Sequence, residues 1–109
     1  MTDITEKNEK KVLVKVHHAY RQIVAVCDSE IIGKKFEQGN MQIDVTEEFF
    51  KGDEMPESKA IKFLQDKADD DACFNIVGKN SVEIAVKAGI IEKDRYITIQ
   101  KVPIVMALV

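Results

Sequence analysis

The stretch Gly78-Lys79-Asn80 combines residue types that could bind an anion. It follows the apolar run 73–77 and precedes a helical pattern over residues 80–88. Free amides at a helix N-terminus attract phosphate, a glycine lets a ligand approach the backbone, and a lysine adds positive charge. The stretch has neither the G-x-x-x-x-G-K-[ST] nor the G-x-G-x-x-G spacing. It is therefore either a phosphate-binding turn or an ordinary connection between a strand and a helix.

Other polar residues could contribute to such a site. Asn75 lies inside an apolar run, where a buried amide must find hydrogen-bond partners. Gly33-Lys34-Lys35 places two cations before Phe36, which suits a phosphate with a stacked base, although a solvated loop would have the same composition. The candidate residues for binding an anion or another ligand are Asp28, Gly33, Lys34, Lys35, Asn75, Gly78, Lys79 and Asn80.

The histidines do not indicate a metal site. His17 and His18 are neighbours in a predicted strand, so their side chains point to opposite faces. One of them could form an acid–base pair with Asp28 or Glu30, but no spacing requires it, and a surface position beside a turn also fits. The chain contains no serine elbow, HExxH, EF-hand loop or zinc-ligand spacing. The sequence therefore predicts no catalytic residue, no metal and no cofactor, and it favours a protein that is not an enzyme.

Charge is unevenly distributed along the chain. The net charge is −3, but residues 44–71 hold ten acidic side chains against four lysines, a net charge of −6. The remaining residues therefore carry a net charge of +3. An acidic domain as a whole does not attract nucleic acid, whereas a small basic surface away from the acidic segment could contact RNA.

Cysteine usage and hydropathy indicate the compartment. Cys27 and Cys73 have no CxxC partner and lie in or beside apolar runs, so we expect buried free thiols and no disulfide scaffold. Residues 1–11 contain no apolar signal segment, and no run reaches the ~18 apolar residues that span a bilayer. We therefore expect a cytoplasmic protein without a membrane partner.

The N-terminal half predicts two strands followed by short helices. Valines alternate over residues 12–16, and residues 23–27 are apolar on both faces, which predicts an N-terminal β-hairpin whose second strand is central. Short helices are expected after Asp28 and after Thr46, with a strand at 41–45 between them. Residues 52–58 are expected to form a loop, because Pro56 disfavours helix before it.

The C-terminal half predicts the two main helices and the remaining strands. Residues 57–68 form an amphipathic pattern. Residues 80–88 match a capping box in which Asn80 is the cap and Glu83 reaches back to it, and Gly89 provides the stop. Strands are expected at 73–77, 95–100 and 102–109. We expect the last of them to pair within the chain's own sheet, with a homodimer contact as the alternative. The predicted fold class is α/β or α+β, a single small domain (11–109) with a mixed sheet after a flexible tail (1–10).

Three segments resemble a small archaeal family of uncharacterised proteins, domain of unknown function 424. They are "VKVHHAYRQIVAVCDSEIIGKKF" at 14–36, "IDVTEEFFKGD" at 43–53 and "NIVGKNSVEIAVKAGII" at 75–91, followed by "VP" at 102–103. Members of this family often have "VPHAQ" near the end, whereas Ile104 and Val105 follow the proline here, so any function of that histidine would be missing. The resemblance implies no established activity. The family's gene neighbourhoods imply an association with translation or ribosome maturation, without a mechanism.

We therefore expect a small cytoplasmic, non-enzymatic binding module. The resemblance implies an accessory to translation or ribosome assembly that contacts the ribosome, RNA or a translation-related protein, as a monomer or a homodimer. The alternative is an enzyme or sensor that binds a small anionic ligand at strand-end loops, using Asp28, Lys34, Asn75 and the Gly78 turn. This alternative requires the four groups to converge on one cleft. A purely structural subunit is a third possibility.

Overall fold

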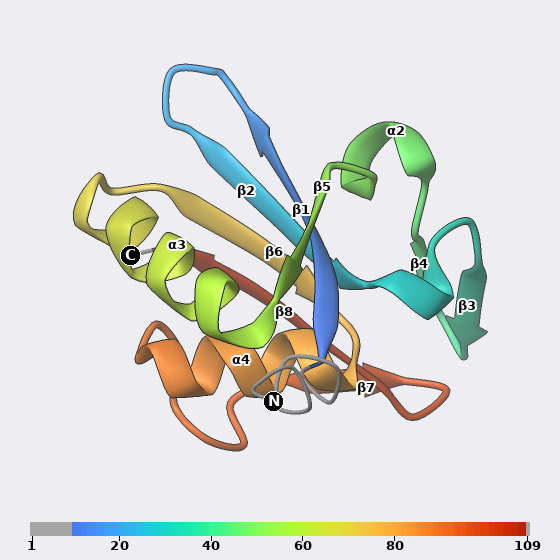
Figure 1. The fold of residues 1–109 in the computed structure, drawn as a ribbon. Coiled ribbons are helices and arrows are strands. Elements are labelled where there is room, and N and C mark those ends of the chain that lie inside the picture. The colour runs from blue at the N-terminus through green and yellow to red at the C-terminus, as the bar shows by residue number, and fades with distance from the viewer. Residues whose placement is uncertain (1–9, 109) are drawn as a thin grey trace, which may run out of the picture.

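A six-stranded mixed sheet forms the centre of the protein. The computed structural model describes residues 10–108, and side chains over residues 10–106. The strand order is β5-β1-β2-β6-β8-β7. Strands β1 (Lys11–His17) and β2 (Ile23–Asp28) form an antiparallel hairpin, and β2 pairs in parallel with β6 (Cys73–Val77). All other neighbouring pairs in this sheet are antiparallel (Figure 1).

The remaining strands form the edges of this sheet and a separate hairpin. Strand β8 (Val102–Leu108) lies between β6 and the edge strand β7 (Ile97–Ile99), and β5 (Asp53–Pro56) forms the opposite edge beside β1. Among the described strands, β3 (Lys35–Gln38) and β4 (Met41–Asp44) pair only with each other. Residues 102–108, predicted as a strand within the sheet, therefore do pair inside the chain.

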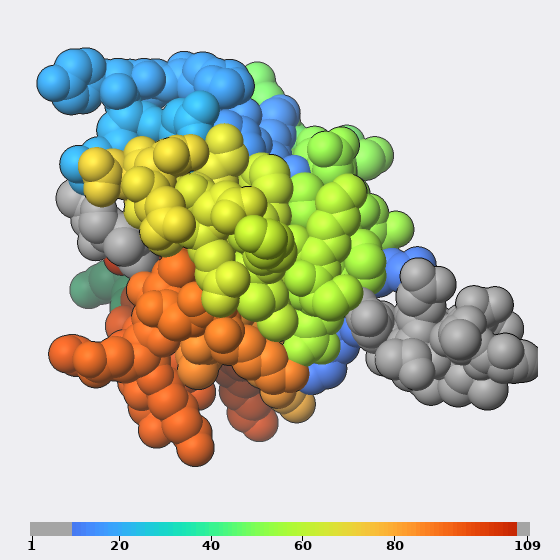
Figure 2. Space-filling view, turned by 60° about the vertical axis from the view of Figure 1, so that its left-hand side comes forward, coloured from blue at the N-terminus to red at the C-terminus, as the bar shows by residue number. Residues whose placement is uncertain are grey.

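Two helices cover one face of the sheet. Helices α3 (Glu57–Asp69) and α4 (Lys79–Ala88) lie side by side there (Figures 1 and 2). Their apolar stripes pack on side chains that alternate along the strands, as the 3.6-residue and two-residue periodicities require. The largest fully buried side chains of this layer are Phe74, Leu64, Ile76, Ile84, Val12, Val24 and Val26.

The opposite face is covered by short elements. The single 3₁₀ turn η1 (Ser29–Ile31), the β3–β4 hairpin and α2 (Glu47–Phe50) pack over a second core of Leu13, Ala25, Cys27, Val45, Phe50, Val77, Ile99 and Ile104. Because both cores include residues of β2, this strand is buried on both sides. The central position predicted for residues 23–27 is therefore confirmed, as are the mixed sheet, the N-terminal hairpin and the two main helices.

One predicted loop and one segment without a predicted structure are strands. Residues 53–56 form β5 because Pro56 lies at the end of an edge strand, where the missing amide hydrogen breaks no ladder bond, and Met55 is buried against the core. Residues 35–38 form β3, since Gly39-Asn40 is a two-residue hairpin turn with a positive φ of 62° at the glycine. Most of the predicted tail, residues 1–9, lies outside the described residues.

Candidate functional site

The Asp28 carboxylate occupies the N-terminus of α4. Its Oδ2 accepts a hydrogen bond from the Asn80 amide at 3.1 Å, and its Oδ1 accepts from the Ser81 amide at 2.8 Å and from the Ser81 hydroxyl at 2.7 Å. Asp28 is only 5% exposed and Ser81 is fully buried. The amides that could have held a phosphate therefore bind a carboxylate of the same chain.

The parallel pairing of β2 with β6 creates this contact. Cys27 lies opposite Val77, so Asp28, the last residue of β2, lies beside Gly78, the residue that follows β6. Gly78 has φ 117°, and a Cβ atom built on it would lie 2.5 Å from the Asp28 carboxyl carbon. The glycine is needed so that the backbone can pass close to Asp28.

The predicted capping box is wrong. Helix α4 begins at Lys79 with Gly78 as its N-cap, so Asn80 lies inside the first turn of the helix and is not its cap. Glu83 instead pairs with Lys10. A carboxylate from a neighbouring strand provides the cap that the local pattern assigned to Asn80. By contrast, the predicted stop at Gly89 is confirmed by its left-handed conformation, φ 80° and ψ 12°.

The other predicted candidates lie in two separate places. Gly33 and Lys34 exchange backbone hydrogen bonds with Val45 at the base of the β3–β4 hairpin, at 2.7 and 2.9 Å, and Lys35 pairs with Glu37 at 3.4 Å. Asn75 lines a small hollow of about 190 Å³ on the face that carries α2. Among the described residues, Asp28, Lys34 and Asn75 therefore do not line a common hollow.

His17 packs against α2. Its ring stacks on Phe49 with centroids 4.4 Å apart, and its Nε2 lies 2.8 Å from the Phe49 carbonyl oxygen. Within residues 10–106, no cluster of histidine, cysteine and acidic side chains could hold a metal ion. These contacts give His17 a packing role beside the hairpin.

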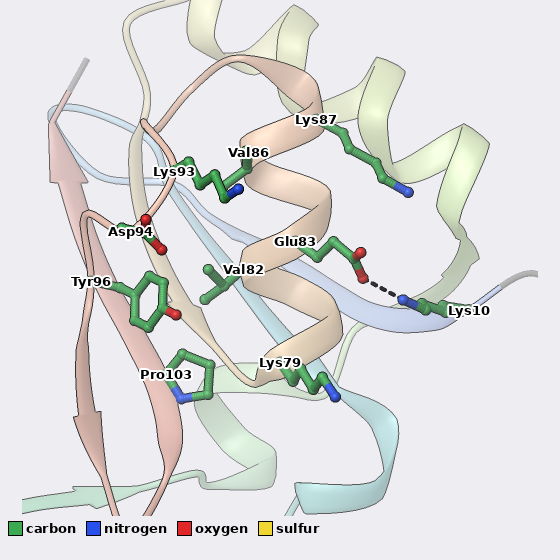
Figure 3. Close-up of a pocket in the computed structure, with 10 residues that line it drawn as sticks. All are labelled: Lys10, Lys79, Val82, Glu83, Val86, Lys87, Lys93, Asp94, Tyr96 and Pro103. Atoms are coloured by element: carbon green, nitrogen blue, oxygen red, sulfur yellow. Dashed lines mark hydrogen bonds and ion pairs between the residues drawn. The ribbon is translucent and has the colours of Figure 1, made fainter.

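The largest of the described hollows, about 620 Å³, lies along α4, and we call it the lysine groove. Figure 3 shows Lys93 and Tyr96 on one side of the helix, Lys10 and Lys87 on the other, and Lys79 at its N-terminal end. Its full lining is Lys10, Lys79, Val82, Glu83, Val86, Lys87, Lys93, Asp94, Tyr96 and Pro103. Four lysines face two carboxylates, so the groove has a net charge of +2 in a protein whose net charge is −3.

Ion pairs neutralise part of this positive charge. The hydrogen bond from Lys10 lowers the pKa of Glu83, and the hydrogen bond to Glu57 raises the pKa of Lys87. These two lysines are therefore engaged with carboxylates at neutral pH. Lys79 and Lys93 make no ion pair within the described part of the chain, and they remain available to an external anion.

A second hollow, about 500 Å³, adjoins the lysine groove at Asp94 and Tyr96, and we call it the edge hollow. Its other lining residues are Arg95, Ile97, Ile104, Val105 and Met106. Tyr96 is 41% exposed, Ile97 56% and Met106 73%. Our sequence reasoning missed this region, although an aromatic residue follows the basic residues Lys93 and Arg95 within 93–96, a composition found in nucleic-acid surfaces.

Residues 16–108 match the model of a family described as protein of unknown function (DUF424). The chain belongs to DUF424. The family resemblance inferred from the three sequence segments is thereby confirmed.

The DUF424 fold also occurs in a solved structure. The chain is similar to the crystal structure of an uncharacterized conserved protein from Methanopyrus kandleri, with a TM-score of 0.82 and 21% identity over 89% of this chain and 90% of that one. At this identity the likeness demonstrates a common fold. None of the curated proteins matches the chain. Within the described residues, no helix is both long and apolar enough to cross a membrane.

Proposed function

We propose that this DUF424 protein is a non-enzymatic binding module that contacts RNA through the lysine groove. It would act in the cytoplasm of an archaeal cell as an accessory to translation or ribosome assembly. The observation that carries the proposal is the position of Lys79 and Lys93, which make no ion pair with any described residue, around an apolar floor beside the exposed ring of Tyr96. Cations that position phosphates and an aromatic surface for bases are the two components of RNA binding.

The charge distribution supports one orientation of binding. Much of the excess of negative charge lies in residues 44–71, which include α2, β5 and α3. The groove is instead lined by α4, by residues 93–96 and by Lys10 and Pro103. A polyanion would be repelled by the acidic segment and attracted by the groove. Since few lysines are available for phosphates, we expect weak binding with a modest dependence on salt.

The alternative, an enzyme or sensor for a small anion, is less well supported. It needs Asp28, Lys34, Asn75 and the Gly78 turn to share a cleft, and these groups lie at three places. The turn amides are already paired with Asp28, and a phosphate beside this buried carboxylate would be repelled. We therefore favour the lysine groove over the Gly78 turn.

A binding titration with matched variants tests the proposal. Fluorescence anisotropy of a labelled RNA is measured at low salt with the full chain, with Lys79→Glu/Lys93→Glu and with Lys34→Glu/Lys35→Glu. Both double variants change the net charge equally, but only the first alters the groove. We expect the groove variant to lose binding and the hairpin variant to retain most of it. Equal losses, or no binding by the unmodified protein, would refute the proposal.

The cellular part of the proposal needs a separate measurement. The tagged protein is sedimented from lysate of its native host at low salt, and associated components are identified after pull-down. We expect part of it to migrate with ribosomal particles and to be released at higher salt, since phosphate contacts are salt-sensitive. Migration wholly in the light fractions, with no translation component enriched, would contradict the translation role while leaving RNA binding to the titration.

A further inference from the structure

We infer that the lysine groove takes single-stranded RNA, with one base stacked on the ring of Tyr96. The inference rests on the proposed function and specifies which form of RNA the groove accepts. It depends on the position of Tyr96, which lines both the lysine groove and the edge hollow and is 41% exposed.

The surroundings of Tyr96 suit an unstacked base. In Figure 3 the ring lies beside Val82 and Pro103, and Val86 extends the apolar floor along α4. A base entering the hollow would therefore cover apolar side chains and the face of an aromatic ring. Every base has a π-face, so such stacking is largely independent of sequence.

Lys79 and Lys93 are placed to hold the backbone of the same strand. Figure 3 shows Lys93 next to Val86 and Lys79 at the N-terminal end of α4, with Tyr96 at a level between them. A strand that runs along the helix would bring successive phosphates toward the two ammonium groups while a base turns toward Tyr96. Phosphate contacts would then fix the position of the strand, and the ring would hold the base.

The edge hollow offers space for a second base. It begins at Tyr96 and is lined by the exposed apolar side chains of Ile97 and Met106. Arg95 is also on its rim and pairs with Glu92 at 3.3 Å, but both side chains are at least 74% exposed. Such a surface pair contributes little free energy, so the guanidinium can exchange it for a phosphate.

A duplex would not use these features. In A-form RNA the bases are stacked inside the helix, and proteins recognise it by its shape, its phosphates and its 2′-hydroxyl groups. A paired base could not reach the apolar floor beneath Tyr96 without first leaving the stack. The apolar hollow and exposed ring therefore favour a single strand.

The test compares RNA forms and Tyr96 variants. Single-stranded oligouridine and oligoadenosine probes of about ten nucleotides, and a perfect duplex of similar length, are titrated against the full chain, Tyr96→Phe and Tyr96→Ala. We expect the single strands to bind more tightly than the duplex. Tyr96→Phe should bind nearly as well as the unmodified protein, and Tyr96→Ala roughly 5- to 100-fold more weakly, as expected for one lost base–aromatic stack. Circular dichroism establishes that the variants are folded.

Tyrosine fluorescence gives a second measurement that does not require a change at Tyr96. The chain has no tryptophan and only two tyrosines, and Tyr20 is fully exposed in the β1–β2 turn. In the Tyr20→Phe protein, emission therefore reports Tyr96 alone, and a stacked base should quench it at saturation with the single strand.

The possible outcomes separate the two proposals. If neither RNA form binds at low salt, the proposed function fails and this inference fails with it. If RNA binds and the groove lysine variant loses it, the proposed function stands. The single-strand inference is then overturned by a duplex that binds equally or more tightly, by a Tyr96→Ala protein with unchanged affinity, or by unquenched Tyr96 emission.

Discussion

Replacing Asp28 with alanine should be among the most damaging single changes in this protein. The carboxylate is 5% exposed and accepts three hydrogen bonds, two of them from fully buried Ser81. Hydrogen bonds to a charged group contribute ~1.5–3 kcal/mol each, and the helix dipole adds up to ~2 kcal/mol. Desolvating the carboxylate offsets part of this sum. We expect Asp28→Ala to lower the free energy of unfolding by about 3–5 kcal/mol.

Two further variants divide this value into its parts. Asp28→Asn keeps one acceptor oxygen and removes the charge, so we expect a loss of about 1–3 kcal/mol. Ser81→Ala removes only the hydroxyl donor at 2.7 Å, and should cost about 1 kcal/mol. In a double-mutant cycle, Ser81→Ala should cost less when Asp28 is already alanine, because the two side chains share a bond.

Urea denaturation followed by circular dichroism measures these changes. The midpoint should fall while the slope m stays constant, since the variants alter stability and not the surface exposed on unfolding. A loss below about 1 kcal/mol for Asp28→Ala, at constant m, would refute our reasoning, because single exposed caps already contribute that much. Additive effects of Asp28→Ala and Ser81→Ala would show that the two residues act independently.

Four further predictions concern the glycines and the cysteines. Gly78→Ala should lower the free energy of unfolding by about 3–5 kcal/mol, since φ 117° is strained for alanine and the new Cβ would displace Asp28. This loss should be smaller in the Asp28→Ala background. Equal shifts of the melting temperature in both backgrounds would contradict this prediction. Gly89→Val should lower the free energy of unfolding by about 1–2 kcal/mol, because valine is strained in the left-handed conformation, and Gly89→Asn should lower it less. Unchanged denaturation midpoints would show that α4 does not need a glycine at its C-terminal end. Burial, with a smaller contribution from the Asp28 carboxylate, raises the pKa of Cys27 from 9.0 to about 12. Native protein at pH 8 should therefore be alkylated first at half-buried Cys73, which mass spectrometry would detect. Because the pKa of Cys27 is raised on folding, the contribution of this thiol to stability is complete below pH 9 and is lost between pH 9 and about 12. A free energy of unfolding that rises over this pH range would contradict the raised pKa.

Features set by local periodicity were predicted well. The alternation of valines in β1, the amphipathic stripe of α3 and the glycine stop at Gly89 depend on neighbours within a few residues. The β3–β4 hairpin also had a local signal, the Gly39-Asn40 turn, which was overlooked. These elements could in principle be read from the sequence by periodicity and turn chemistry alone.

Two features set by tertiary pairing were not predicted. The Asp28 cap depends on the parallel register of β2 and β6, and no local pattern around Asn80 encodes that register. The lysine groove joins Lys10, helix α4, residues 93–96 and Pro103, four segments that only the folded sheet brings together. The sequence therefore indicated that a basic surface could exist outside residues 44–71, but not where it lies.

The parallel pairing of β2 with β6 also determines the order in which the protein can fold. The β1–β2 hairpin is joined by a short turn and can close within microseconds. By contrast, residues 29–72 separate β2 from β6, and the entropy of closing so long a loop is lost before the contacts that compensate for it have formed. We therefore expect the slow step to be the docking of residues 73–108 on the hairpin, with the Asp28–Ser81 contact formed in that step. During synthesis from the N-terminus, β2 would keep an unpaired apolar edge until β6 emerges, and this interval is when the nascent chain is most exposed to aggregation.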